Sequence, residues 1–173
     1  MITDHKQMHS CSRFAGSVQR YHAWPTIQRQ TVAEHTFHVM RIYLEIFGAI
    51  SSQTAENILV HDMGEIASGD IPFPIKMNNP VLKEEIDRLE EDALEQMGLH
   101  QHQLSILEKT RIKICDLLEM WEFGMVEVSM GNHYAKPIVE QTSRATRDMM
   151  AVLHEEEQNE ISEYITKTHR QLA

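Results

Sequence analysis

Cysteine is scarce in this sequence, and long apolar runs are missing from it. The two cysteines, Cys11 and Cys115, do not form a CxxC pair, which excludes a disulfide framework and a cysteine-based zinc site. No run of about 18 apolar residues occurs, and the first residues lack the apolar stretch of a secretory signal. We therefore expect a cytoplasmic protein with no membrane partner.

Positive charge is also scarce, with 16 Lys and Arg against 26 Asp and Glu and a formal net charge of −10. Sequence-independent nucleic-acid binding needs Lys and Arg to displace counterions, so we expect no nucleic-acid partner. An anionic small molecule remains compatible if a metal or a few local cations hold it. A Gly-rich P-loop, GxGxxG, GxSxG and HExxH are all missing, which excludes the familiar sites built on those motifs.

The composition that remains is typical of a helical globular protein. The chain has 173 residues, of which 42% are hydrophobic and 24% charged, and these values predict one folded domain over residues 1–173. With seven glycines, five prolines and apolar residues at helical spacing, the predicted fold class is all-α. The pattern predicts helices over residues 31–48, 53–67, 80–98 and 103–131, and a last one from 137 onward.

Several residues mark the expected ends of these helices. Thr31 has the spacing of a capping box, and Pro72 and Pro74 are expected to interrupt helix between the second and third segments. Gly124 is a place where the fourth helix is expected to bend or break. The acidic run at 155–157 is interpreted as a solvated helix face or a helix break.

Four side chains stand out because they are polar in segments that otherwise read as core. His61 and Asp62 interrupt an apolar helix, His35 lies on the apolar stripe that follows Thr31, and Asp116 lies in the most apolar segment. The alternative is that His61 and Asp62 only bond to the backbone or to each other. Two imidazoles and two carboxylates from three helices predict a site for Zn, Mn, Fe, Co or Ni.

Such a site suits hydrolysis, because a bound divalent metal lowers the pKa of water and polarises a phosphoryl oxygen. Glu65 follows His61 by four residues and Asp62 by three, so on a helix it would share their face and could orient or deprotonate that water. The alternative for Glu65 is an exposed helical glutamate.

The separated His35, the His61-Asp62 doublet and the later Asp116 resemble the pattern of the HD-domain metal-dependent phosphohydrolases. TVAEH at 31–35, HDMGE at 61–65 and SGDIPFPIK at 68–76 are similar to the small deoxynucleotidase branch. The resemblance implies an HD-domain helical bundle with the metal site between core helices. It also implies that the residues matching Glu65 and Asp70 act in catalysis or substrate contact.

Within that branch, residues 20–35 most resemble the phage dATP triphosphohydrolases of the DatZ group. This resemblance implies conversion of dATP to deoxyadenosine and triphosphate in a phage-infected cell, which would lower the dATP pool. The implied cofactor is a divalent transition metal, with zinc, cobalt or manganese as first candidates. A second ion, Mg²⁺, is an open option on the phosphates.

Hydrolysis of a deoxynucleoside triphosphate or monophosphate in this branch would occur at the same α-phosphorus. Discrimination between these substrates must therefore depend on contacts with groups other than the α-phosphate. Phosphate contacts are expected from Arg20, Lys76 and Lys113. The candidates for base, sugar and other substrate contacts are Trp24, Pro25, Ile27, His38, Asp70, Pro74 and Ile75. For Trp24 and His38 the alternative is plain packing, for Lys113 a solvated lysine, and for Asp70 an Asx turn with Gly69.

Two other functions remain open from the sequence. One is a 5′-deoxynucleotidase that acts on monophosphates, and the other is a non-catalytic helical nucleotide-binding or scaffold protein. The expected partners are a small deoxynucleotide and further copies of the chain, because methionines that suit a subunit interface are frequent in the later helices. They are Met120, Met125, Met130, Met149 and Met150. Methionine is equally a filler of ordinary cores.

Overall fold

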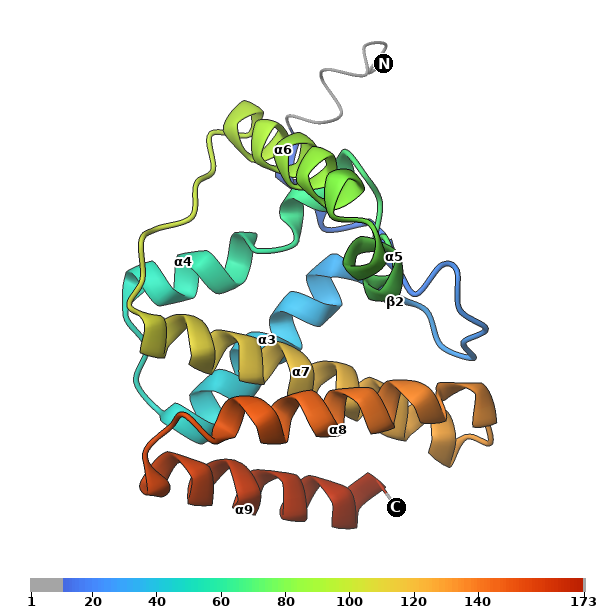
Figure 1. The fold of residues 1–173 in the computed structure, drawn as a ribbon, viewed down its shortest axis with the longest axis vertical. Helices are drawn as coiled ribbons and strands as arrows, with labels where there is room; N and C mark the ends of the chain where they lie inside the picture. Colours follow the sequence, from blue (N-terminus) through green and yellow to red (C-terminus); the bar gives the residue numbers. More distant parts are fainter. Residues whose placement is uncertain (1–10, 173) are drawn as a thin grey trace.

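The computed structural model describes residues 11–172, apart from the side chains of Phe73, Pro74 and Met77. The candidate Pro74 therefore lies outside the described side chains. The fold is a helical bundle, which confirms the all-α prediction (Figure 1). In chain order its elements are α2 (Ser12–Ala15), β1 (Gln19–Arg20), β2 (Gln30–Thr31), α3 (Val32–Phe47), α4 (Ser52–Val60), the 3-10 helix η1 (Met63–Ile66), α5 (Phe73–Asn78), α6 (Pro80–Gln96), α7 (Ile106–Ser129), the 3-10 helix η2 (His133–Ala135), α8 (Lys136–Met150) and α9 (Glu155–Leu172).

Three of the longer helices, α3, α6 and α7, begin at residues whose side chains accept backbone N–H groups. Thr31 and Glu34 form the predicted capping box of α3, and Ser105 and Glu108 form a second one on α7. Asn79 accepts from the backbone of the first turn of α6, as predicted. These caps fix where α3 and α7 start, and both helices carry residues of the candidate site.

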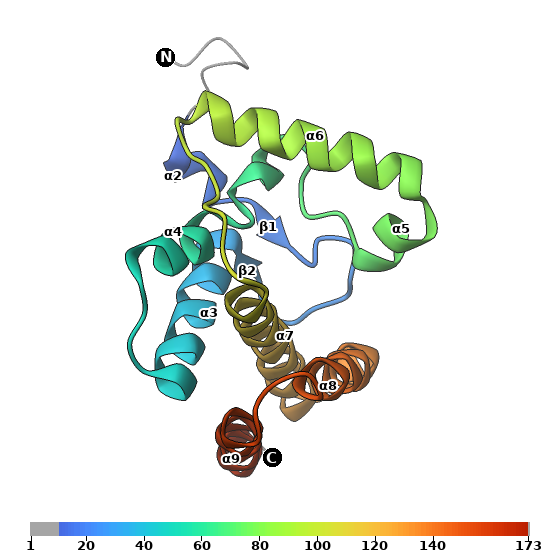
Figure 2. The ribbon, with the colours of Figure 1, turned by 60° about the vertical axis from the view of Figure 1, so that its left-hand side comes forward.

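The core lies between α3, α4, α7 and α9. Its buried members include Val39, Ile42, Ile58, Ile114 and Leu118, each at most 1% exposed. Helix α7 packs along α8 and crosses α3, and α9 packs against both α3 and α7 (Figures 1 and 2). Helix α6 lies at the opposite end of the molecule from α9 and packs on η1.

Three helix predictions need correction. The second helix ends at Val60 and not near 67, because the chain turns at residues 61–62 before η1 begins. Helix α7 continues through Gly124, where a Cβ would lie 2.9 Å from Val139 Cγ2, so the glycine serves close packing of α8. The last helix is two helices, α8 and α9, with the break before the acidic run 155–157.

The sequence pattern also missed the short elements. Strands β1 and β2 form an antiparallel ladder that pairs Arg20 with Gln30 and Gln19 with Thr31. Two residues per strand are too few for an alternating pattern to be visible. In the described part of the chain, no helix combines the length and apolarity needed to cross a membrane.

Candidate metal centre

Three of the four predicted ligands, from α3 and the turn after α4, lie around one point, and the fourth, Asp116 on α7, contacts one of them. The Nε2 atom of His35 lies 3.2 Å from His61 Nε2, 3.4 Å from an Asp62 carboxylate oxygen and 3.2 Å from an Asp116 carboxylate oxygen. One ligand atom each from His35, His61 and Asp62 lies within 4.8 Å of the others. Asp116 joins this group through its contact with His35.

These spacings fit a single ion. Two ligand atoms that bind one ion at about 2.1 Å lie about 3.0 Å apart at octahedral angles and about 3.4 Å apart at tetrahedral angles. The Nε2 atoms of His35 and His61 and the carboxylate of Asp62 fall in this range. The donor set of imidazole nitrogens and carboxylate oxygens also suits a borderline transition metal.

The turn after α4 explains how two adjacent residues reach one centre. In a continuous helix, neighbouring side chains point about 100° apart. Here His61 is the C-cap residue directly after α4 and keeps helical backbone angles, whereas Asp62 departs from them with φ −109° and ψ 3°. The early helix end therefore lets His61 Nε2 and Asp62 lie 3.4 Å apart and face the same point.

Both imidazoles are oriented through their other ring nitrogen. His35 Nδ1 donates to Glu119 Oε2 at 2.5 Å, and His61 Nδ1 donates to the backbone oxygen of Ile58 at 2.6 Å. Glu119 also accepts from the side-chain amide of Gln30 at 2.6 Å. With the proton on Nδ1, each Nε2 would be free to offer its lone pair to a bound ion, which is the usual arrangement around metal-bound histidine.

Sequence reasoning missed Glu119 and Gln30. Glu119 is 2% exposed and follows Asp116 by three residues, so it lies on the same face of α7. That spacing was the available signal, but an acidic residue in a helix usually reads as surface. Gln30 reaches the site only through the ladder of β1 and β2.

Acidic groups crowd the centre and shift its pKa values. Burial, followed by the negative charge of Asp62, raises the pKa of Glu65 to about 8. Burial also raises the pKa of Asp116, but hydrogen bonding from His35 and the charge of Lys113 outweigh this and hold it well below its ordinary value. Burial and Arg20 lower the pKa of His35, whereas Glu119 and Asp116 raise it, with a net result of about 9.

The three predicted phosphate-binding cations each contact an acidic side chain. Buried Arg20 donates to Asp62, and its Nε atom is one of the buried polar atoms without a partner. Lys113 pairs with Asp116, one helical turn away on α7, as its spacing predicted. Lys76 lies 3.3 Å from a carboxylate oxygen of Glu90 on α6. Arg20 and Lys113 are thus brought to the predicted ligands, and Lys76 is brought to α6.

Glu65 and Asp70 lie next to this cluster in different settings. Glu65 is 6% exposed in η1, and its Oε2 atom is buried without a partner. Asp70 accepts the backbone N–H of Tyr21 at 2.6 Å, and Tyr21 has a positive φ of 55°. A positive φ is uncommon for a non-glycine residue, so the bond to Asp70 fixes an unusual turn directly after Arg20.

The predicted base contacts lie in the loop between β1 and β2, which is bonded to the far end of α7. The Trp24 indole N–H donates to the Tyr134 backbone oxygen at 3.0 Å, and the Pro25 oxygen accepts from Asn132 at 2.7 Å. The side chain of Ile27 is 57% exposed.

Two remaining candidates lie on helices. His38 lies edge-on to its neighbour Phe37 on α3, with ring centroids 5.3 Å apart, and its substrate contact stays a prediction. Ile75 is 49% exposed on α5.

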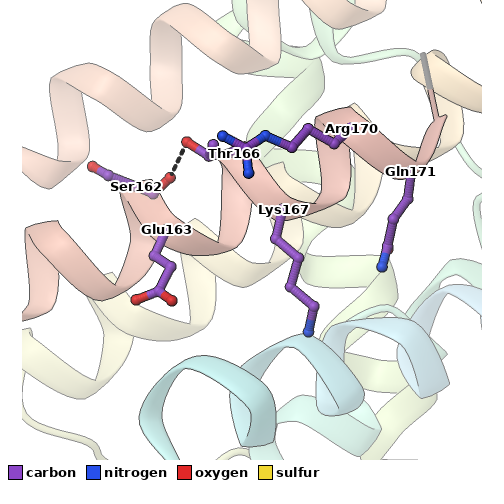
Figure 3. A pocket seen from close by; sticks show the side chains of 6 residues that line it. All are labelled: Ser162, Glu163, Thr166, Lys167, Arg170 and Gln171. Atoms are coloured by element: carbon purple, nitrogen blue, oxygen red, sulfur yellow. Dashed lines mark hydrogen bonds between the residues drawn. The ribbon is translucent and has the colours of Figure 1, made fainter.

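A separate hollow of about 620 Å³ lies along α9 (Figure 3). All of its lining residues belong to that one helix, and none of them is a predicted ligand or substrate contact. They are Ser162, Glu163, Thr166, Lys167, Arg170 and Gln171. The hollow is therefore a surface feature and is separate from the metal centre.

Comparison with known proteins adds a family to this geometry. The family model described as 5′-deoxynucleotidase YfbR-like matches residues 9–172. The 5′-deoxynucleotidases of Yersinia pestis (strain Pestoides F) and Yersinia pseudotuberculosis serotype O:3 (strain YPIII) are 27% identical over 149 residues. Each alignment covers 69% of this chain and 75% of the relative.

A solved structure shares the fold along nearly the whole chain. It is the cyanophage S-2L HD phosphohydrolase DatZ, bound to dA and one catalytic Zn²⁺ ion. The two structures superpose with a TM-score of 0.72 at 23% identity, covering 99% of this chain and 98% of the other. The likeness confirms the predicted HD-domain helical bundle.

Proposed function

The chain belongs to the YfbR-like family of HD-domain 5′-deoxynucleotidases, and on this premise we propose that it hydrolyses dATP to deoxyadenosine and triphosphate. The observation that carries a hydrolytic function is that ligand atoms of His35, His61 and Asp62 lie within 4.8 Å of one another, with Asp116 in contact with His35. A buried group of imidazoles and carboxylates is a set of ligands that a divalent ion can bind.

We assign the ion to those four residues and expect zinc, cobalt or manganese, with Mg²⁺ on the phosphates as an open option. When bound, such an ion supplies an acidic water and polarises a phosphoryl oxygen. Glu119 and the Ile58 carbonyl hold His35 and His61 in the orientation that this role requires.

Glu65 is the proposed proton acceptor. Its buried Oε2 has no partner, and its raised pKa of about 8 suits a group that takes up and returns a proton near neutral pH. In the proposed reaction, water attacks the α-phosphorus and the bond to the 5′-oxygen breaks. Glu65 takes the proton of the water and returns it to the leaving 5′-oxygen.

Arg20 and Lys113 are the proposed contacts to the phosphates nearest the centre, because they already lie against Asp62 and Asp116. Lys76 is proposed for the outer phosphates. Its bond to Glu90 at 3.3 Å keeps the ammonium group in place beside η1. Asp70 is proposed to contact the deoxyribose through the carboxylate oxygen that Tyr21 does not use.

The choice of dATP is supported by the likeness to DatZ, whose structure contains dA and a catalytic zinc. A second candidate, hydrolysis of deoxynucleoside monophosphates, is favoured by the family description and by the Yersinia relatives. Both reactions break the same bond at the α-phosphorus, so the metal centre serves either. The two differ in the phosphate product.

The experiment that separates them is product identification. The purified protein is freed of metal with a chelator, reloaded with zinc, cobalt or manganese, and incubated with each dNTP and dNMP. Triphosphate and deoxyadenosine from dATP support the proposal, whereas phosphate release from monophosphates alone supports the second candidate. No hydrolysis of any deoxynucleotide by reloaded protein that binds metal would contradict both and favour a non-catalytic binding protein.

A further inference from the structure

One face of α7 carries a row of contacts that extends well beyond the metal centre. Asp116 contacts His35, and Glu119 accepts from His35 and Gln30. One turn later, Phe123 stacks on Tyr21 with ring centroids 4.5 Å apart and planes within 3° of parallel. One turn further still, Glu127 bonds to the loop that follows Tyr21. Residues three or four apart share a helix face, so a single face organises the centre and the loop.

The loop at 21–29 is joined to the metal centre at both of its ends. The ladder of β1 and β2 places Arg20 and Gln30 opposite each other. Arg20 donates to Asp62, and Gln30 donates to Glu119, which in turn orients His35. The loop therefore begins and ends at residues that are bonded to the metal centre, Arg20 directly to Asp62 and Gln30 through Glu119.

Glu127 holds the middle of the loop. Its side chain is buried, with a relative exposure of 0%. One carboxylate oxygen accepts the Gln28 N–H at 2.7 Å, and the other accepts the Ile27 N–H at 2.7 Å and the Asn132 side-chain amide at 2.6 Å. The same Asn132 amide also donates to the Pro25 carbonyl at 2.7 Å.

A fully buried carboxylate is costly unless donors satisfy both of its oxygens. Among the described residues, the donors to Glu127 are uncharged N–H groups, two of them from the loop backbone. The hydrogen bonds outweigh burial and lower the pKa of Glu127 below its ordinary value, so the carboxylate is ionised at neutral pH. The charge thus stabilises one particular conformation of the loop.

We propose that Glu127 is a positioning residue, which holds loop 21–29 as a preformed wall of the deoxynucleoside site. The inference rests on the proposed function. The loop backbone is fixed by Glu127 and Asn132, while the side chain of Ile27 stays 57% exposed and available to a ligand. Because the loop is ordered before substrate binds, the nucleotide does not have to supply the free energy of ordering it.

The test variant is Glu127→Gln, which keeps the shape of the side chain. It replaces one carboxylate oxygen, an acceptor, with an NH₂ group that would face the N–H donors of the loop or of Asn132. We expect the amides of Ile27 and Gln28 to exchange hydrogen about tenfold faster, since loss of a buried hydrogen bond is worth roughly this factor in an equilibrium. We also expect the KM for the hydrolysed deoxynucleotide to rise about tenfold with kcat little changed. The Co²⁺ affinity of the centre should stay at its wild-type value.

The matched control is Glu157→Gln, which removes another buried carboxylate, on α9, that pairs with Arg111 and not with the loop. It should leave KM and the exchange of the loop amides unchanged. Asn132→Ala is the second variant, because it removes the bonds to the Pro25 carbonyl and to Glu127 but keeps the Glu127 carboxylate and the loop amides that donate to it. It should raise KM in the same direction and thereby test the loop if Glu127→Gln does not fold.

A wild-type KM in both loop variants would overturn the proposal, as would an equal loss of kcat and Co²⁺ affinity in Glu127→Gln. An equal rise of KM in Glu157→Gln would also overturn it. The failure of the proposed function would look different, because the wild-type protein itself would then hydrolyse no deoxynucleotide. In that case the amide exchange of loop 21–29 still reports whether Glu127 holds the loop.

Discussion

Two regions of this molecule contain buried or half-buried acids, and the charges around those carboxylates differ between the two regions. Near α9, the acids have cations: Glu157 accepts from Arg111 at 2.6 Å, and Glu122 accepts from Arg41 at 2.6 Å. At the metal centre, Asp62 and Asp116 also contact cations, Arg20 and Lys113, but the two carboxylates act on each other's charge, and the charge of Asp62 also acts on Glu65.

The difference separates structural from functional carboxylates. A separate acid–cation pair balances its own charge within the fold, whereas in a group of neighbouring acids each negative charge favours protonation of the others and favours binding of a cation from solution. Glu65 shows the effect, because burial and the charge of Asp62 raise its pKa to about 8. Substitutions in the two regions should therefore have opposite consequences for activity and stability.

The largest effect is expected from Asp116→Asn, which keeps the size of the side chain but removes its charge from the centre. Hydrolysis should fall by at least about a thousandfold, because one ligand of the ion is lost. The melting temperature should change by about 4 °C or less, since the Asn side chain can still accept from His35 and the ionic pair that is lost involves a half-exposed lysine. Deoxyadenosine release and thermal unfolding check the two values, and wild-type turnover would contradict the four-ligand site.

Glu65→Gln should have the next largest effect on activity. Removal of a proton acceptor is expected to lower kcat by about 10² to 10⁴ while Co²⁺ affinity is kept. Single-turnover hydrolysis and a Co²⁺ titration separate the two properties. A loss of metal binding that matches the loss of kcat would place Glu65 among the ligands and not at the water.

The same variant gives a pH test on metal-free protein. The Glu65 carboxyl keeps its proton up to about pH 8 in the fold but only to about its ordinary value of 4.5 in the unfolded chain. The folded state therefore binds more protons in this window, and its stability falls as the pH rises through it. The melting temperature of Glu65→Gln, relative to that of the wild type, should therefore rise between pH 5 and pH 9. A constant difference would contradict the raised pKa.

In the other region, Glu157→Gln should lower stability and leave hydrolysis unchanged. Loss of the charge that Arg111 contacts is expected to cost about 1–2 kcal/mol, or a few degrees in melting temperature. Glu163→Gln, an exposed change on the same helix, is the matched control and should cost less than about 0.5 kcal/mol. Equal costs for the two variants would show that the pair with Arg111 contributes nothing.

The smallest effect is expected from Lys167→Ala, beside the hollow on α9 shown in Figure 3. Lys167 pairs with Glu45 at 2.7 Å, but its side chain is 59% exposed, so solvent and salt screen the pair. Urea unfolding should show a change of about 0.5 kcal/mol or less. A larger change that disappears in high salt would give α9 a stronger ionic attachment than this exposure predicts.

The sequence predicted the parts of the molecule whose signals are local. The spacing of Thr31 predicted the start of α3. The candidate ligands His35, His61, Asp62 and Asp116 were recognisable as polar residues in apolar segments. All of these can be recognised without knowing which helices touch. The helix class followed from apolar spacing for the same reason.

What the sequence could not predict depends on contacts between distant segments. Gln30 serves the centre only because β2 pairs with β1, and Glu127 is buried only because the loop covers it. Gly124 is indistinguishable in sequence from a helix break, yet it allows close packing against Val139. Whether a single chain forms one domain, and whether copies associate through the later methionines, stay predictions.

The two-residue ladder has a consequence for how such proteins diversify. Its register fixes Arg20 beside Gln30, and these two residues bond to different members of the site, Arg20 to Asp62 and Gln30 to Glu119. The connecting segment can therefore gain, lose or exchange residues without moving either strand. If the proposed function holds, selection can act on that segment to change which nucleobase is accepted, while the residues of the metal centre stay as they are.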